Sequence, residues 1–192
     1  MFRCSGLFSA IALTGCITAD VELPGGRATR PYGGSAHGIP GTIEAEHYDE
    51  GASGKAYLDV DEKNHGAAYR GVTQVDIEKR PDASGGHGIG WTKAGEWVVY
   101  TVHVTEPGRY SVEFPVASAK KGGTFHLELD GRAITDAIDV PNTGSWQQLE
   151  IIRTETVPLK RGVQRLKMVM DTNGETNSIG DIDLLRFTKL EE

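Results

Sequence analysis

The segment from Gly88 to Val102 constrains the fold of this 192-residue chain more than any other stretch. It passes from a glycine-rich turn into a run whose side chains alternate as they do across a β-strand. One side of that run carries Trp97, Val99 and Thr101, and the other carries Val98, Tyr100 and Val102. A strand with two largely apolar sides is typical of a sandwich interior with a neighbour on each face. Trp91 precedes the strand, in the turn, where a large aromatic either closes the end of the core or offers a flat surface to a ligand.

Short β-like runs, separated by turn signals, continue from Ile39 to the end of the chain. No segment shows sustained helical periodicity, and the 25 glycines are scattered singly between apolar runs, which indicates many tight turns. The runs predict strands near residues 42–48, 67–70, 74–78, 96–104, 110–117, 124–130, 134–140, 146–152, 163–170 and 181–187. About nine or ten short strands predict an all-β fold, a two-sheet β-sandwich or jelly roll.

The N-terminal residues have the features of an export signal. One positive charge precedes an apolar run that is too short to remain as a membrane-spanning helix. Leu13-Thr14-Gly15-Cys16 resembles the bacterial lipobox, in which the signal is cut before the cysteine and the thiol is lipidated. We therefore expect a lipoprotein signal peptide over residues 1–15 and a lipid anchor on Cys16, the alternative being an ordinary signal peptide cut near Ala19. The protein would be an outer-membrane or cell-surface lipoprotein or, under the alternative, secreted or periplasmic.

Residues 16–38 combine several glycines and prolines with little apolar periodicity, so we expect a flexible tether there. The folded domain would then cover residues 39–192. Both cysteines, Cys4 and Cys16, precede that domain, so no disulfide is expected within it. The formal net charge is −7 and no Lys/Arg cluster stands out, which excludes nucleic acid as an expected partner.

The chain shows no motif of the common enzyme classes. Its six histidines lack metal-ligand spacing, and neither a nucleophile elbow nor a phosphate loop is present. It does contain carboxylates two residues apart, in the pairs Glu44/Glu46, Asp76/Glu78 and Asp181/Asp183. Such pairs share one side of a strand and repel each other unless a hard cation such as Ca²⁺ joins them, although each could also be a solvated strand face. If the first and last strands are neighbours, the first and last pairs approach each other.

Two of the three tryptophans lie at junctions between a glycine-rich turn and a strand. These are Trp91, which follows Gly88-Ile89-Gly90, and Trp146, which follows Asn142-Thr143-Gly144-Ser145. Trp97 lies within a strand, and we expect it in the core. An indole face packs against the C–H face of a sugar ring, so two facing loop tryptophans would form a slot for one pyranose. A loop tryptophan can equally cap the core, and the residues alone leave both readings open.

Short motifs from about residue 39 to residue 188 occur together and in a specific order. They are Ile43-Glu44-Ala45-Glu46, Tyr69-Arg70, Val75-Asp76-Ile77-Glu78, the segment 89–97, Gly123-Thr124-Phe125-His126-Leu127 with Asp130-Gly131, the segment 140–147, and Met170-Asp171-Thr172-Asn173-Gly174 leading to the segment 180–187. Together they resemble the family 6 carbohydrate-binding modules, which accompany plant and algal polysaccharide hydrolases. The resemblance implies an antiparallel β-sandwich of the galactose-binding-domain-like, jelly-roll type. It also implies a structural Ca²⁺ and a sugar cleft among the loops at one end.

The resemblance also implies which residues bind the cation. The opening Glu-x-Glu of the family and an Asp of its last strand correspond to Glu44, Glu46 and Asp183. The backbone carbonyl of Arg70 is a further candidate ligand.

For the sugar, the resemblance implies a clamp between Trp91 and Trp146. The family usually has an Asn in its last strand that hydrogen-bonds the sugar, whereas this chain has Asp181. An ionised Asp only accepts hydrogen bonds, which favours sugar hydroxyls and disfavours a nearby uronate or sulfate. Alternatively Asp181 joins the cation, and Glu78 or Asn177 makes the polar contact with the sugar. Some members of the family use a second site on the concave face of one sheet, and the sequence leaves that site open.

We therefore expect a non-catalytic, surface-tethered module that recognises β-linked plant or algal polysaccharide such as xylan, β-glucan or agarose. A glycoside hydrolase acting on the same substrate is a candidate partner, and the only membrane contact would be the lipid anchor. One alternative is a small lyase or hydrolase that uses the pair Asp76/Glu78 or Asp181/Asp183. The others are a structural or adhesive envelope lipoprotein, and a related calcium-dependent sugar-binding family of the same fold that prefers uronates.

Overall fold

The structure is a computed structural model that describes residues 29–71 and 73–191. The predicted signal peptide, Cys16 and residues 17–28 of the predicted tether lie outside these ranges. Within the described ranges, no helix has the length and apolar character needed to cross a membrane.

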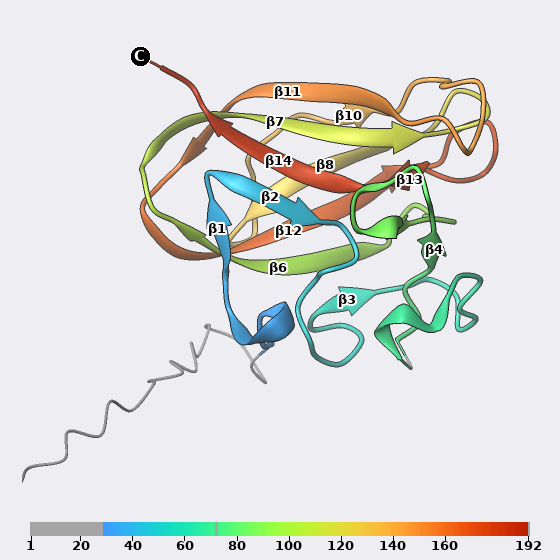
Figure 1. Cartoon of the computed structure of the whole chain (residues 1–192), viewed down its shortest axis with the longest axis horizontal. Helices are drawn as coiled ribbons and strands as arrows, with labels where there is room; N and C mark the ends of the chain where they lie inside the picture. Colours follow the sequence, from blue (N-terminus) through green and yellow to red (C-terminus); the bar gives the residue numbers. More distant parts are fainter. Residues whose placement is uncertain (1–28, 72, 192) are drawn as a thin grey trace, which may run out of the picture.

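Two sheets pack face to face (Figure 1). In the described residues the first sheet has the order β1 (His37–Ile39), β6 (Trp97–Val104), β12 (Gly162–Thr172), β8 (Thr124–Leu129), β10 (Ile138–Asp139), with β3 (Tyr57–Leu58) on β6 and β9 (Arg132–Ala133) on β8. The second sheet has the order β2 (Gly41–Glu44), β14 (Leu184–Lys189), β7 (Gly108–Ala117), β13 (Asp181–Ile182), β5 (His87–Ile89), β4 (Ile77–Lys79), with β11 (Glu150–Leu159) on β7. Three short 3₁₀ helices complete the described elements: η1 (Tyr32–Gly34), η2 (Ala68–Arg70) and η3 (Ser84–Gly86).

The core lies between the two sheets and follows the alternation of the strands. On β12, Leu166, Met168 and Met170 are buried while the residues between them are not. Phe114 of β7 meets Phe125 of β8 edge to face across the sandwich, with ring centroids 5.1 Å apart. The predicted two-sheet antiparallel β-sandwich is confirmed, except that β1 runs parallel to β6.

Several predicted strands are shorter than the sequence pattern indicated, and most of the difference falls in loops. The strand predicted at residues 67–70 is replaced by η2 at Ala68–Arg70, residues 134–140 contain only the two residues of β10, and β11 begins at Glu150, after Trp146. β2 ends at Glu44 because the chain turns there: the Ala45 N–H donates to the Asp183 carbonyl and the His47 N–H to the Glu44 carbonyl. The alternation predicted through residue 48 therefore stops, and Glu46 becomes buried.

The residues just before the predicted domain belong to the domain. The Thr29 hydroxyl donates to Asp49 at 2.9 Å, Tyr32 stacks on His47 with ring centroids 4.1 Å apart, and β1 pairs with β6. The prediction of a tether extending to residue 38 is therefore wrong from Thr29 onward. Residues 29–38 show little apolar periodicity because hydrogen bonds and ring stacking, and not a run of buried apolar side chains, hold them against the domain.

Trp97 is not part of the core, contrary to the prediction. Its ring is only partly buried on the outward side of the first sheet, and the Lys167 ammonium lies 4.5 Å from the ring centroid. The neighbouring outward residues Val99 and Thr101 are buried because the segment from Asp49 to Ala56 hydrogen-bonds along them. β6 is thus buried on both faces over only part of its length. The alternation of apolar and polar residues in the sequence does not indicate where the covering segment ends.

Candidate functional site

Loops at one end of the sandwich enclose a cavity of about 440 Å³. This volume falls within the range of small-molecule sites, roughly 300–1,000 Å³. Four separate segments line it, with Glu78, Trp91, Lys93, Trp146, Gln147, Thr176, Asn177, Ser178 and Asp181. All the residues that the sequence analysis associated with a sugar are therefore gathered here, together with Lys93, Gln147, Thr176 and Ser178, which it did not single out.

Trp91 faces the cavity from a loop that is fixed immediately after it. Thr92 is buried, its hydroxyl donates to the Gly180 carbonyl at 2.6 Å, and its carbonyl accepts from the Ile179 N–H at 2.9 Å. Trp91 itself has φ +50° and is 43% exposed. A bulky residue in this backbone region costs on the order of 1 kcal/mol or more, and the surroundings must hold it there. Its exposure excludes the reading of Trp91 as a plug of the core.

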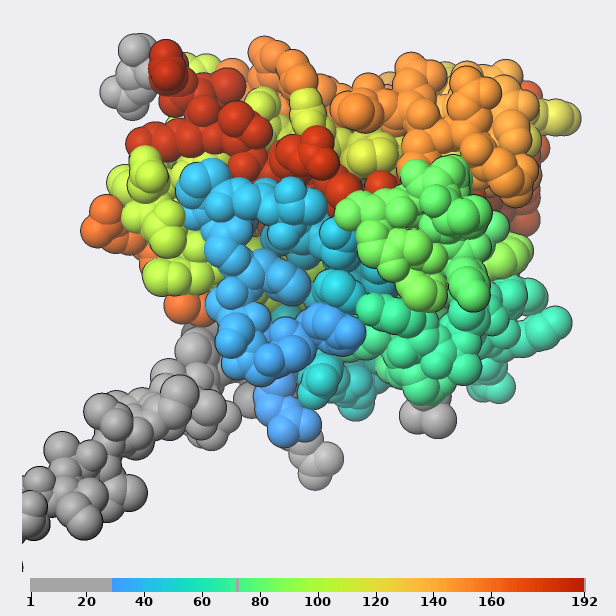
Figure 2. Space-filling view, viewed as in Figure 1, coloured from blue at the N-terminus to red at the C-terminus, as the bar shows by residue number. Residues whose placement is uncertain are grey.

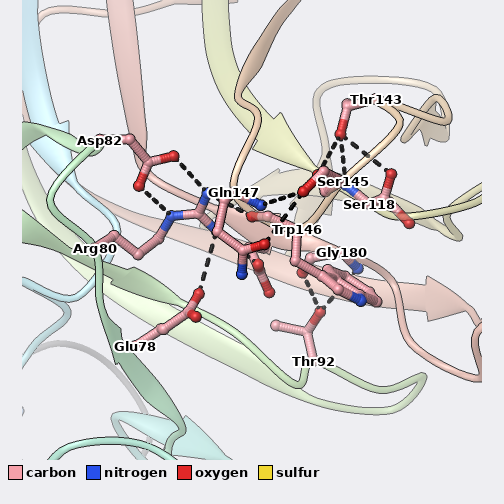
Figure 3. A network of polar contacts seen from close by, with 11 residues as sticks. Glu78, Arg80, Asp82, Thr92, Ser118, Thr143, Ser145, Trp146, Gln147 and Gly180 are labelled. Carbon is pink, nitrogen blue, oxygen red and sulfur yellow. Dashed lines mark hydrogen bonds and ion pairs between the residues drawn. The ribbon is translucent and has the colours of Figure 1, made fainter.

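The loop that carries Trp146 is anchored at two points. Thr143 is buried and exchanges hydrogen bonds with Ser118: its N–H donates to the Ser118 carbonyl and its side-chain oxygen accepts from the Ser118 N–H, both at 3.0 Å. The Trp146 carbonyl accepts from an Arg80 guanidinium nitrogen at 2.7 Å (Figure 3). In the space-filling view the green segment after β4 accordingly lies beside the orange loop that precedes β11 (Figure 2).

Arg80 is the residue of this end that sequence reasoning missed. Its side chain is only 3% exposed and forms ion pairs with Asp181 at 2.6 Å, Asp82 at 2.9 Å and Glu78 at 3.2 Å (Figure 3). Burial lowers the pKa of Arg80, but the hydrogen bond to Asp82 and the three carboxylates outweigh it, so the pKa rises above its usual value. No signal in the sequence indicates this, because a lone arginine before Pro81 in a polar turn is normally solvated.

Glu78 and Asp181, the acid pair, present their carboxylates to the cavity. Burial first, and the neighbouring Glu78 carboxylate next, raise the pKa of Asp181 to about 7 against the opposing charge of Arg80. Gly90 leaves room for Asp181, since a Cβ at that glycine would lie 3.0 Å from Asp181 Oδ1. Asp76 does not join the acid pair, because its carboxylate accepts from the His65 N–H.

The side chains of Asp181 and Asp183 lie in different environments, although the two residues are only two positions apart. Asp183 lies between β13 and β14 and belongs to neither, so the strand alternation that would keep the two carboxylates on one side is interrupted there. Asp181 lines the cavity, whereas Asp183 Oδ1 accepts from the Ser84 N–H at 3.0 Å. The expectation that four acids converge is therefore wrong for Asp181, which stands with the tryptophans.

The other acids do gather, around η3. The Ser84 hydroxyl donates to Glu44 at 2.7 Å, and a Cβ at Gly85 would lie 3.5 Å from a Glu46 carboxylate oxygen. β2 pairs with β14, with Glu44 opposite Leu184, so the first of the predicted strands (residues 42–48) and the last one are neighbours. Glu44, Glu46 and Asp183 thus face one short turn.

These three carboxylates fit a hard cation. Glu46 is 1% exposed, and neither of its carboxylate oxygens has a hydrogen-bond partner; one oxygen of Glu44 is also buried without one. Burial first, then Glu44 and Asp183, raise the pKa of Glu46 to about 7. Burial raises the pKa of Asp183 to about 6. Within residues 29–71 and 73–191, however, no group of three or more His, Cys, Asp or Glu side chains is placed so that it could hold a metal ion by side chains alone, and a Ca²⁺ here would also need backbone carbonyl ligands.

Arg70 lies beside this cluster. Its guanidinium donates to the carbonyls of Glu46 and Tyr48, both at 2.7 Å, and lies between the rings of Tyr32 and Tyr48, at 4.6 and 4.0 Å from their centroids. The side chain therefore fixes the backbone that carries Glu46. The role of the Arg70 carbonyl as a ligand stays a prediction.

A second hollow, of about 320 Å³, lies on the outward side of the first sheet, where Trp97, Lys55, Glu128, Arg165 and Lys167 are among its lining residues. Lys167 lies over the Trp97 ring and also 3.6 Å from Glu128. One face of this indole is therefore covered by Lys167, whereas the nearest ring to Trp91 in the described residues is that of His65, with centroids 6.5 Å apart.

Comparisons with known proteins identify the family to which the chain belongs. The family model described as "Carbohydrate binding module (family 6)" matches residues 65–189. The clotting factor G alpha subunit of Tachypleus tridentatus is 28% identical over 127 residues, a match that covers 65% of this chain and only 18% of that protein.

Two solved structures are similar over nearly their whole length. One is the C-terminal family 6 module of LamC, a marine laminarinase from Zobellia galactanivorans (25% identity, TM-score 0.58, 77% of this chain and 98% of that one). The other is a β-1,3-glucan-binding family 6 module from Bacillus halodurans (25% identity, TM-score 0.60, 80% of this chain and 98% of that one). With a family model that matches well over half of the chain and with this shared fold, the protein belongs to family 6 of the carbohydrate-binding modules.

Proposed function

We propose that this chain binds polysaccharide by holding one sugar ring between Trp91 and Trp146, while the acid pair accepts hydrogen bonds from its hydroxyls. The observation that supports this most directly is the cavity that both tryptophans and both acids line. Each indole contributes about 0.5–1.5 kcal/mol beyond the area that it buries. Because the hydroxyls exchange hydrogen bonds with water for hydrogen bonds with protein, the polar contacts fix orientation more than affinity.

β-Glucan is the first ligand to test, with xylan and agarose next. Two solved relatives support this order, since one is named for β-1,3-glucan binding and the other belongs to a laminarinase. The acid pair together with Asp82 leaves more carboxylates than the single Arg80 balances. A uronate or sulfate at the clamped ring would be repelled, so we propose a preference for rings without a negative charge.

Substituting Trp91→Ala or Trp146→Ala should weaken binding to insoluble β-glucan by about 2 kcal/mol, close to thirtyfold, because each removes one wall of the clamp. Depletion from solution by the polysaccharide measures this, with circular dichroism to confirm that each variant is folded. Ile151→Ala, at an exposed apolar residue on β11, is the control and should bind as the wild type does. Undiminished binding by both tryptophan variants would exclude the clamp.

We propose that the protein does not cleave its ligand. Within residues 29–71 and 73–191, the carboxylic acids that line the cavity are Glu78 and Asp181. Both are ion-paired with Arg80, so neither is free to act as an independent acid or base. Incubation with β-glucan, xylan and agarose should release neither reducing ends nor unsaturated ends. Release of either, lost in Glu78→Gln, would favour the lyase or hydrolase alternative.

We propose further that Glu44, Glu46 and Asp183, with the Arg70 carbonyl, hold a structural Ca²⁺. The unpartnered buried oxygens of Glu44 and Glu46 support this, since a buried carboxylate without a partner is unfavourable. The cation would neutralise the cluster and join β2, η3 and the start of β14. Its role would be structural, because the acids that face the cavity are different ones.

Calcium should therefore raise the melting temperature relative to EDTA. At about 100 times Kd a ligand bound only to the folded state adds about 2.7 kcal/mol. Glu46→Gln should abolish the difference, whereas Glu128→Gln, an acid on the outward side of the first sheet, should retain it. Equal melting temperatures with calcium and with EDTA, together with a metal analysis that finds no bound calcium, would contradict the proposed calcium site.

We also propose that Cys16 is lipidated and tethers the module to the outer membrane or cell surface, near a hydrolase that acts on the same polysaccharide. The support is the lipobox-like Leu13-Thr14-Gly15-Cys16. Wild-type protein expressed in a Gram-negative host should partition with membranes, and Cys16→Ala should shift it to the soluble fraction. Retention of Cys16→Ala in the membrane fraction would contradict the lipid anchor.

A further inference from the structure

Charge is distributed unevenly around the cavity. The carboxylates of Glu78 and Asp181 line it, whereas Arg80, which balances them, does not. The Arg80 guanidinium donates hydrogen bonds to those two acids, to Asp82 and to the Trp146 carbonyl. A ligand that enters the cavity therefore meets the acids and not the guanidinium.

The one cation among the lining residues is also paired. The Lys93 ammonium lies 2.8 Å from the Asp61 carboxylate, which does not line the cavity. Around the cavity, within the described part of the chain, the four carboxylates of Glu78, Asp82, Asp181 and Asp61 thus face two cations. The faces of the two tryptophan rings add further negative potential, because an indole attracts cations over its ring.

We propose that the clamp prefers a sugar ring that carries a free amino group, as in a glucosamine unit of a deacetylated β-1,4-glycan, over the same ring with a hydroxyl or an acetamide. The inference rests on the sugar site proposed above and names its ligand class. A protonated amine has only donors and an ionised carboxylate only accepts, so the Glu78 carboxylate and the amine are complementary, and Asp181 adds a further acceptor oxygen. Hydrogen bonds between charged partners are about twice as strong as neutral ones.

The same argument ranks the other ring substituents. A hydroxyl donates one hydrogen bond without a charge, so the neutral ring binds more weakly than the aminated ring. An acetamide is bulkier and brings a carbonyl acceptor, which would face acceptors on the protein. The order expected is therefore amine, then hydroxyl, then acetamide.

Three β-1,4-linked tetraoses test this, built from glucosamine, glucose and N-acetylglucosamine, which differ only at one ring position. The full chain is titrated with each by calorimetry at about pH 6, where an amine of this kind is charged. We expect the glucosamine tetraose to bind about tenfold more tightly than the glucose tetraose, and the N-acetylated one most weakly. Raising the salt concentration should reduce the advantage of the amine, because exposed charges are screened.

Substitutions assign the preference to the acid pair. Glu78→Gln should bring the ratio of amine to hydroxyl affinity close to one, and Asp181→Asn should lower it. Glu155→Gln, which removes the same charge from β11 beside a different groove, should leave the ratio unchanged. Circular dichroism confirms that the variants are folded.

A laminaritetraose titration separates the two levels of the proposal. Equal or tighter binding of the glucose tetraose by the wild type, or an amine advantage that survives both Glu78→Gln and Asp181→Asn, would overturn the amine preference alone. If no tetraose binds, laminaritetraose included, both the proposed sugar site and the amine preference are contradicted.

Discussion

A single buried guanidinium holds together the end of the sandwich that contains the cavity. Arg80 joins Asp181, at the start of β13, to the loop that carries Trp146, and its side chain is almost fully buried. Breaking a buried ion pair by removing one partner is costly because it leaves the other charge unpaired, and here three carboxylates would be left. The spacing between the aromatic walls and the polar side of the cavity thus depends on one side chain.

The fold was predictable because alternation and turn residues act locally. The strand near residues 163–170 and the two-sheet sandwich follow from those patterns, and the family resemblance placed Trp91 and Trp146 together, as they are in the cavity. The burial of Arg80, the separation of Asp181 from Asp183 and the partial exposure of Trp97 were not predictable. Each depends on where a loop crosses a strand or where a strand is interrupted, and such tertiary contacts leave no periodic trace in the sequence.

The cavity and the acid cluster share one connection, the segment between β4 and β5. That segment carries Arg80 at its start and Ser84 in η3, and Ser84 binds Glu44 and Asp183. The segment from β13 to β14 also contributes to both, because Asp181 lines the cavity and Asp183, two residues later, belongs to the acid cluster. A cation in the cluster would restrain the turn that positions Arg80, so local stability at one site supports geometry at the other.

The packing of Thr29 and η1 against the domain also sets how far the module can reach. If Cys16 carries the lipid, residues 17–28 separate it from Thr29, and a chain of that length spans at most roughly 40 Å. This distance is comparable to the diameter of a small domain, so the cavity would sample a thin shell above the membrane surface. A polysaccharide held there would stay close to the surface, within range of other proteins anchored in the same membrane.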